Sequence, residues 1–121
     1  MKYTDSHEWI KLEGDTGRVG ISKYGQKELG EIVYVELPKI GQTVEAGEEV
    51  AVLESTKAAV DFYAPVSGKV TKVNETLKED VTAVNTSPEG EGWLFEMEIN
   101  HLGQLDQLLT LEIYSEMTTN K

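Results

Sequence analysis

Short runs in which apolar and polar residues alternate, separated by glycine-containing turns, occupy most of the chain. Alternation with a period of two predicts β-strands. The irregular alternation in residues 32–37 predicts burial on both faces of that strand. We expect strands at residues 3–12, 18–21, 32–37, 50–53, 60–63, 65–73 and 93–99, with a turn at 13–17 joining the first two and with 93–99 as the last strand.

Helical signals are fewer. Ser22 predicts the N-cap of a short helix at 23–29, and Gly30 predicts its end. Residues 74–85 are expected to be helical or irregular, and residues 86–92 to form a loop. Near the C-terminus, apolar residues recur at helical spacing and are expected mostly to pack against the core; a second stripe at 111–117 predicts a further short helix, and 118–121 are expected to fray. The first stripe consists of Leu102, Leu105, Leu108 and Leu109.

Composition limits the classes of function. A length of 121 residues predicts one domain, and no apolar run is long enough to span a bilayer. Zero cysteines exclude disulfides and thiolate metal sites, and the histidines, His7 and His101, are too isolated to predict a metal site. Trp9 and Trp93 are expected to be core aromatics. The first residues do not read as a signal or transit peptide, so we expect a bacterial cytoplasmic protein.

The chain is strongly acidic. Twenty-two acidic residues against eleven basic ones leave a net charge of −11. This charge argues against binding to nucleic acid, whose phosphates would be repelled. It favours partners with basic docking surfaces, or alternatively serves only to keep the protein in solution.

A polar tetrapeptide, residues 54–57, lies between the predicted strands 50–53 and 60–63 and has the composition of a tight hairpin turn. Lys57 is expected at its tip. The neighbouring Thr56 and Ala58 are too small to cover it, so its amine would project into solvent on a flexible stem. An acylating enzyme needs such an amine, although any exposed lysine on a hairpin shares these features.

Several separate motifs extend over nearly the whole chain: Ser6-His7-Glu8-Trp9, Val19-Gly20-Ile21, Gln26, Leu29-Gly30, Val33 to Pro38, Glu54-Ser55, Lys57-Ala58, Pro65-Val66-Ser67-Gly68 and Gly90-Glu91-Gly92-Trp93. Around Lys57, Glu54 stands three positions before the lysine, Gly68 eleven after it and Gly41 sixteen before it. In these motifs and spacings the chain resembles the lipoyl-carrier family, and within it the glycine cleavage H-proteins.

The resemblance implies a mainly β fold, the barrel-sandwich hybrid of lipoyl and biotinyl carriers, with short helices that include C-terminal ones. It implies one lipoyl-carrier domain over residues 1–121, with the lysine hairpin at about 50–63 and a C-terminal helical segment at about 101–117. Lys57 would carry lipoate through an amide bond, as N6-lipoyllysine. Glu54, Gly41 and Gly68 would serve recognition by the lipoylating enzyme.

The resemblance also implies a carrier rather than an enzyme. Such a carrier shuttles an aminomethyl group from the glycine decarboxylase (P-protein) to the folate-dependent aminomethyltransferase (T-protein), and the dihydrolipoyl dehydrogenase (L-protein) reoxidises its arm. A lipoate ligase or lipoyl transferase would attach the arm. Because the arm visits several enzymes, a monomer is expected. His7 has no nucleophile and no orienting acid placed beside it by the sequence, so an independent enzyme is not expected.

By similarity, Glu8, Asp61 and Ser6 line the pocket that shelters the loaded arm. A carboxylate there would pair with the cationic amine of the cargo and offset its desolvation. The alternative for each is a solvated surface side chain. Two positions depart from the family: Glu28 stands where many members have histidine, and Glu89 where an aromatic residue is common. We interpret Glu28 either as a second carboxylate for the cargo or as a plain helix-surface residue.

Three other functions remain as alternatives. An H-like lipoyl carrier acting in lipoate relay or another lipoyl-dependent pathway would use the same Lys57 with a different client. A biotin carrier is disfavoured, because that class flanks its lysine with methionines, whereas Thr56 and Ala58 stand here. A purely structural acidic domain would leave Lys57 unmodified.

Overall fold

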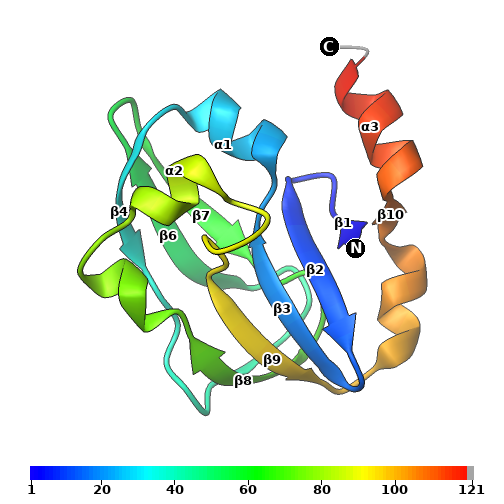
Figure 1. Ribbon diagram of the computed structural model, residues 1–121. Coiled ribbons are helices and arrows are strands. Elements are labelled where there is room, and N and C mark those ends of the chain that lie inside the picture. The colour runs from blue at the N-terminus through cyan, green and yellow to red at the C-terminus, as the bar shows by residue number, and fades with distance from the viewer. Residues whose placement is uncertain (120–121) are drawn as a thin grey trace.

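The computed structural model describes residues 1–119, which form two β-sheets with short helices around them (Figure 1). The mainly β prediction is confirmed. The larger sheet has seven strands in the order β10-β1-β2-β3-β9-β8-β5, and the smaller has three in the order β4-β6-β7. All pairings are antiparallel. The strands are β1 (Lys2–Tyr3), β2 (Glu8–Glu13), β3 (Thr16–Ile21), β4 (Ile32–Glu36), β5 (Thr43–Val44), β6 (Glu49–Ser55), β7 (Ala59–Tyr63), β8 (Gly68–Val73), β9 (Phe95–Ile99) and β10 (Leu109–Thr110).

The main hydrophobic core lies between the two sheets. Phe62 of β7 meets Phe95 of β9 edge to face, with ring centroids 6.2 Å apart, and both rings are buried. Apolar residues from both sheets extend this cluster. Because one sheet buries its apolar face only against another layer, this packing fixes the hairpin β6–β7 to the larger sheet. A second, smaller cluster joins Tyr3, Trp9 and Tyr114.

The helices are α1 (Lys23–Leu29), η1 (Glu75–Lys78), α2 (Thr82–Thr86), η2 (Leu102–Gln107) and α3 (Leu111–Thr119). The predicted limits of α1 are confirmed: the Ser22 side chain accepts a hydrogen bond from the Gly25 amide, and Gly30 follows with φ 85°. The short helix predicted after residue 111 is confirmed as α3. Of the residues expected to fray, Thr118 and Thr119 belong to α3, whereas residues 120–121 lie outside the described residues.

Several strand predictions were wrong. The strand expected at 3–12 is divided into β1 and β2 by a turn. β4 is not buried on both faces, since Val33 and Tyr34 are 52% and 53% exposed. β4 is an edge strand whose register shifts between Ile32 and Tyr34, which explains both the irregular alternation and the exposure. β9 is not the last strand, because β10 pairs with β1.

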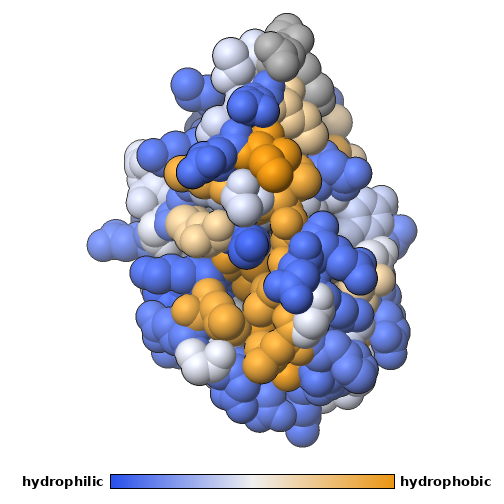
Figure 2. All heavy atoms as spheres, turned by 90° about the vertical axis from the view of Figure 1, so that its right-hand side faces the viewer, coloured by the Kyte–Doolittle hydropathy of each residue, from blue (hydrophilic) through white to orange (hydrophobic). Residues whose placement is uncertain are grey.

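The C-terminal segment is less buried than predicted. Leu102, Leu111 and Ile113 are at least half exposed, and Leu109 lies in β10 rather than in a helix. Figure 2 shows a continuous apolar strip, bordered by hydrophilic side chains, on the face of the molecule to which this segment belongs. Only some of the C-terminal leucines therefore pack against the core. No helix formed by residues 1–119 combines the length and apolar character needed to cross a lipid bilayer.

Candidate functional site

The tip of the β6–β7 hairpin presents Lys57 to solvent. The turn spans residues 56–58, so Glu54 and Ser55 belong to β6 rather than to the turn that the sequence predicted. The Ser55 amide donates to the carbonyl of Ala58 at 2.8 Å. The Ser55 Oγ accepts the amides of Lys57 and Ala58, each at 3.1 Å. These bonds hold the backbone of the turn, while the Lys57 side chain is exposed, as predicted.

The same tip is attached to the segment that follows α1. The Thr56 amide donates to the carbonyl oxygen of Glu31 at 3.0 Å. The stem of Lys57 lies along Gly30, since its Cε is 3.5 Å from the position that a Cβ on Gly30 would occupy. The salt bridges among residues 1–119 are Arg18–Glu96 and Lys78–Glu75, and Lys57 has no part in them. The backbone of Lys57 is thus fixed by hydrogen bonds, whereas its amine forms no salt bridge with a carboxylate of residues 1–119.

A cavity of about 210 Å³ lies between α1, the β1–β2 turn and the β6–β7 hairpin. Its walls combine apolar side chains with three carboxylates, Glu8, Glu28 and Asp61. Ser6 lines the cavity as well, so the structure brings together the predicted pocket residues Ser6, Glu8 and Asp61. The apolar lining residues include Leu29, Leu53, Val60 and Phe62. Such a combination suits a mainly apolar ligand that carries a positive charge.

Glu8 is the buried member of this group, with 4% of its surface exposed. Its Oε1 accepts hydrogen bonds from the Thr4 hydroxyl at 2.6 Å and the Ser6 hydroxyl at 2.7 Å. Burial raises the pKa of Glu8 above its ordinary value of 4.5, and these two hydrogen bonds oppose the shift. A cation entering the cavity would favour the charged form of this carboxyl.

Asp61 and Glu28 are both exposed and stand at the rim of the cavity. Asp61 lies on β7, the strand that leads away from Lys57. Glu28 comes from α1, and its hydrogen bond with Tyr24 raises the pKa of that phenol. The structure therefore places Glu28 both at the cavity rim and on the exposed surface of α1, and its role toward a cargo stays a prediction.

The predicted recognition residues lie in different parts of the fold. Glu54 is on β6 of the lysine hairpin, opposite Ala59. Gly68 pairs with Val44 and Ile99 in the larger sheet, and Gly41 donates its amide to the carbonyl of Val70. Gly41 has φ 93°, a conformation that L side chains rarely adopt. The two glycines are therefore away from the hairpin tip, and each has a backbone reason to be glycine.

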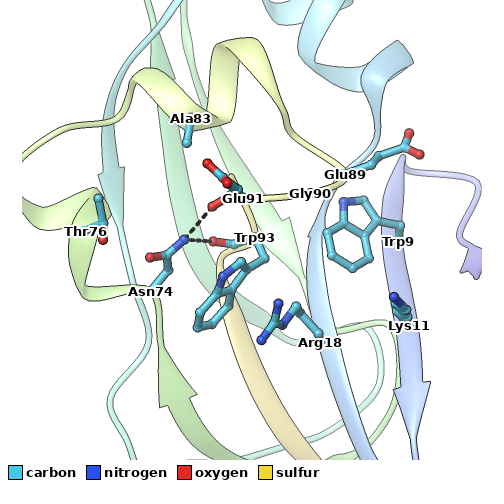
Figure 3. A pocket seen from close by; sticks show the side chains of 10 residues that line it. All are labelled: Trp9, Lys11, Arg18, Asn74, Thr76, Ala83, Glu89, Gly90, Glu91 and Trp93. Carbon is cyan, nitrogen blue, oxygen red and sulfur yellow. Dashed lines mark hydrogen bonds between the residues drawn. The ribbon is translucent and has the colours of Figure 1, made fainter.

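A second cavity, of about 470 Å³, surrounds Trp93 (Figure 3). The Arg18 guanidinium lies over the indole of Trp93, 4.5 Å from its centroid, and Lys72 lies 5.8 Å from it. Arg18 is also paired with Glu96 at 2.7 Å, and Asn74 donates to the carbonyls of Glu91 and Trp93. Polar groups here satisfy one another, which indicates a structural cluster. Trp9 is 1% exposed, as expected of a core aromatic. Trp93 is only partly buried but packs against the cluster of Tyr3, Trp9 and Tyr114, so its prediction as a core aromatic is confirmed in part.

Sequence reasoning missed two contributors to the site. His7 lines the cavity, and its place between Ser6 and Glu8 was a usable signal. Gly30 was predicted only as the end of a helix, yet the stem of Lys57 lies directly beside it. Contact between residues 30 and 57 depends on the tertiary fold and has no sequence signature.

Comparisons with known proteins agree with this geometry. A sequence profile described as "Glycine cleavage H-protein" matches residues 1–121. The chain is 50% identical over 115 residues to the glycine cleavage system H protein of Thermotoga maritima, covering 95% of this chain and 93% of that protein. It is 51% identical over 115 residues to a protein of the same name from Thermus thermophilus, covering 95% and 90%.

A solved structure shares the fold. The crystal structure of a glycine cleavage system H protein from Mycobacterium marinum superimposes with a TM-score of 0.89 at 37% sequence identity, covering 98% of this chain and 95% of that one. The predicted barrel-sandwich architecture is thereby confirmed.

Proposed function

The chain belongs to the glycine cleavage H-protein family, the lipoyl-bearing carriers of the glycine cleavage system, and on that premise we propose that Lys57 is the residue to which its lipoyl group is attached. One observation carries this proposal: Lys57 is exposed at a hairpin tip whose backbone is held by hydrogen bonds. The aliphatic stem of its side chain lies against Gly30, next to the cavity. The relatives' shared name favours glycine cleavage over the lipoate-relay alternative.

The residues present fit a lipoyl arm. The apolar walls of the 210 Å³ cavity suit its hydrocarbon chain, and the carboxylates of Glu8, Glu28 and Asp61 suit a cationic cargo at its end. When bound, lipoate supplies the sulfur that carries the aminomethyl group. The chain itself supplies no thiol, since it has no cysteine.

The protein's own contribution is to tether and to shelter. Attachment to one lysine replaces free diffusion of the cargo by a high local concentration at each enzyme that the carrier docks to. The apolar cavity excludes water from the cargo, which protects a group that water would otherwise remove. We propose that Glu8, which is buried and held by Thr4 and Ser6, accepts a hydrogen bond from the cationic amine, with Ser6 and Asp61 beside it.

The family implies the P-, T- and L-proteins of the system as partners. We further propose attachment of the arm by a lipoate ligase or lipoyl transferase, action as a monomer in a bacterial cytoplasm, and residues 1–121 as one carrier domain. Glu54 would take part in recognition by that enzyme directly, from the lysine hairpin. Gly41 and Gly68 would do so indirectly, by fixing the backbone of the larger sheet on which the hairpin packs.

Intact mass and peptide mapping test the attachment site. Protein purified from cells that make lipoate is expected to gain the mass of one lipoyl group, located on the peptide containing Lys57. Lys57→Arg should lose the added mass, and the matched control Lys27→Arg, on the exposed face of α1, should keep it. A lipoyl group found on another lysine, or unmodified protein from such cells, would overturn the proposal.

A further inference from the structure

Tyr114 is the only residue of α3 that is buried, among the residues that the structure describes. Its ring stacks on that of Tyr3, with centroids 4.4 Å apart and an interplanar angle of 6°. α3 contributes no residue to the lining of the 210 Å³ cavity. Any effect of Tyr114 on the cavity must therefore pass through its neighbours.

The hydroxyl of Tyr114 is hydrogen-bonded to two segments that are distant in sequence. It lies 2.6 Å from Nδ1 of His7 and 2.6 Å from Oγ of Ser22. Burial raises the pKa of Tyr114, so the phenol keeps its proton at neutral pH. With one proton, the hydroxyl donates to one of these groups and accepts from the other.

Both neighbours belong to the same side of the cavity. His7 lines the cavity itself. Ser22 is the N-cap of α1, and α1 supplies Gly25, Glu28 and Leu29 to the lining. Figure 1 shows the β1–β2 turn, which carries His7, between α1 and α3. One hydroxyl on α3 thus joins the two segments that together form this side of the cavity.

His7 is held in a conformation that the local sequence does not favour. It has φ 74°, and within residues 1–119 every other positive φ belongs to a glycine. Such a backbone costs free energy in a residue with a side chain, so surrounding contacts must maintain it. The Ser22 amide donates to the His7 carbonyl at 2.9 Å, and the His7 Cβ lies close against Gly25. A change in the position of the His7 ring would therefore shift the residues of α1 that contact His7.

From these contacts we propose that Tyr114 is a positioning residue for the arm cavity. Its hydroxyl fixes the His7 ring and the start of α1 relative to each other, and so holds this wall of the cavity in the position that the cargo-bearing arm requires. The inference rests on the proposed function, because it is the lipoyl arm that the cavity receives. The C-terminal helix α3 thereby helps to maintain the cavity that shelters the arm, although none of its residues lines that cavity.

Tyr114→Phe tests this proposal, because it removes the hydroxyl and retains the ring that stacks on Tyr3. Thr118→Val is the matched control: it removes a hydroxyl from the same helix, and within residues 1–119 Thr118 bonds only to carbonyls of α3. In the lipoylated, cargo-loaded protein, Tyr114→Phe is expected to speed the release of ammonia about threefold to tenfold, the range expected for one or two lost hydrogen bonds. Thr118→Val should leave this rate at the wild-type value.

A double-mutant cycle separates positioning from simple anchoring of α3. His7→Asn removes the imidazole and keeps a residue that tolerates positive φ. If Tyr114 acts through His7, the effects of Tyr114→Phe and His7→Asn on ammonia release should be less than additive. Full additivity, or a wild-type release rate in Tyr114→Phe, would overturn the proposal.

Hydrogen exchange in the unlipoylated protein provides a measurement that needs no arm. Tyr114→Phe is expected to speed exchange of the Gly25 and Gln26 amides, which bond to Ser22, about threefold or more, with no change in Thr118→Val. Unchanged exchange would reject the link to α1. Absence of lipoyl mass with altered exchange would instead contradict the proposed function and leave the Tyr114 link standing.

Discussion

Gly68 lies directly against the backbone of Glu98, and a Cβ on Gly68 would overlap the Glu98 carbonyl oxygen. These residues belong to the paired strands β8 and β9, whose separation is set by their ladder of hydrogen bonds. The carbonyl cannot move aside as a flexible side chain would. The glycine is therefore required by the sheet, whatever it contributes to recognition.

Gly68→Ala should destabilise the protein by about 3 kcal/mol, because one strand must shift to admit a methyl group. Gly14→Ala is the matched control: Gly14 has φ 64° but open space around it, so only the backbone cost of about 1–2 kcal/mol applies. Urea unfolding of both variants measures the difference. Lipoylation of Gly68→Ala should fall only as far as its folded fraction falls, and a specific loss in folded protein would show that recognition is direct.

Ser55→Ala should loosen the tip of the lysine hairpin. The Ser55 Oγ accepts two amide hydrogens of the turn, so its loss is expected to cost about 1 kcal/mol and to slow lipoylation of Lys57. Thr56→Val is the control, because it leaves in place the hydrogen bond that the amide of residue 56 donates to the Glu31 carbonyl. The lipoylated fraction at fixed times, measured by mass, reports the effect. Equal rates in the two variants would mean that the lipoylating enzyme does not need a fixed turn.

The stability of the protein should depend on the titration of Glu8. Because burial raises the pKa of Glu8 above 4.5, the folded protein holds this proton more tightly than the unfolded chain. The stabilisation from protonated Glu8 is complete below pH 4.5 and is lost as the pH rises through the folded-state pKa. The free energy of unfolding of wild type should therefore fall relative to that of Glu8→Gln as the pH rises from 4.5 through this folded-state pKa. A constant difference across this range would show that the Glu8 pKa is unshifted.

Glu8→Gln should also release the cargo faster while leaving lipoylation intact. Loss of a charge-assisted hydrogen bond to a cation in a buried site is expected to shorten the lifetime of the loaded form about tenfold. Glu28→Gln should shorten it only about twofold, because Glu28 is exposed and solvent screens its charge. Glu31→Gln, an exposed carboxylate outside the cavity lining, is the control. An unchanged lifetime in Glu8→Gln would remove Glu8 from the mechanism.

Docking to the partner enzymes should depend strongly on salt. With a net charge of −11, association with a basic surface is steered by attraction that salt screens. The dissociation constant for the glycine decarboxylase is expected to rise several-fold between about 50 and 200 mM salt, in a direct binding titration. An affinity that stays flat over this range would mean that the acidic surface serves only to keep the protein in solution.

Local signals predicted most of the fold correctly. Ser22 and Gly30 gave both ends of α1 because capping is a property of a few neighbouring residues. The lysine hairpin was predicted by two apolar segments on either side of a polar turn. Two of the failures depend on distant partners: β4 is half exposed because it is an edge strand, and β10 exists only because β1 lies beside it.

The candidate site divides in the same way. Lys57, Glu8, Asp61 and Ser6 were found from motifs, and the structure places the last three around one cavity. The link from Tyr114 to His7 was not predictable, since 107 positions separate them and no pattern connects them. Sequence motifs identify the residues that line the cavity, whereas the residues that support them, such as Tyr114, are identified only from the packing in the structure.

Gly30 ends α1 with φ 85° and ψ −158°, a backbone conformation open essentially only to glycine, and the stem of Lys57 lies beside it. Asparagine, the usual substitute where a chain turns left-handed, adopts φ of about +57° and ψ of about +47° and would not fit this conformation. Position 30 therefore limits how this scaffold can be redesigned: an engineered version can change its client enzymes or its surface charge, but the residue beside the base of its swinging prosthetic arm must stay glycine.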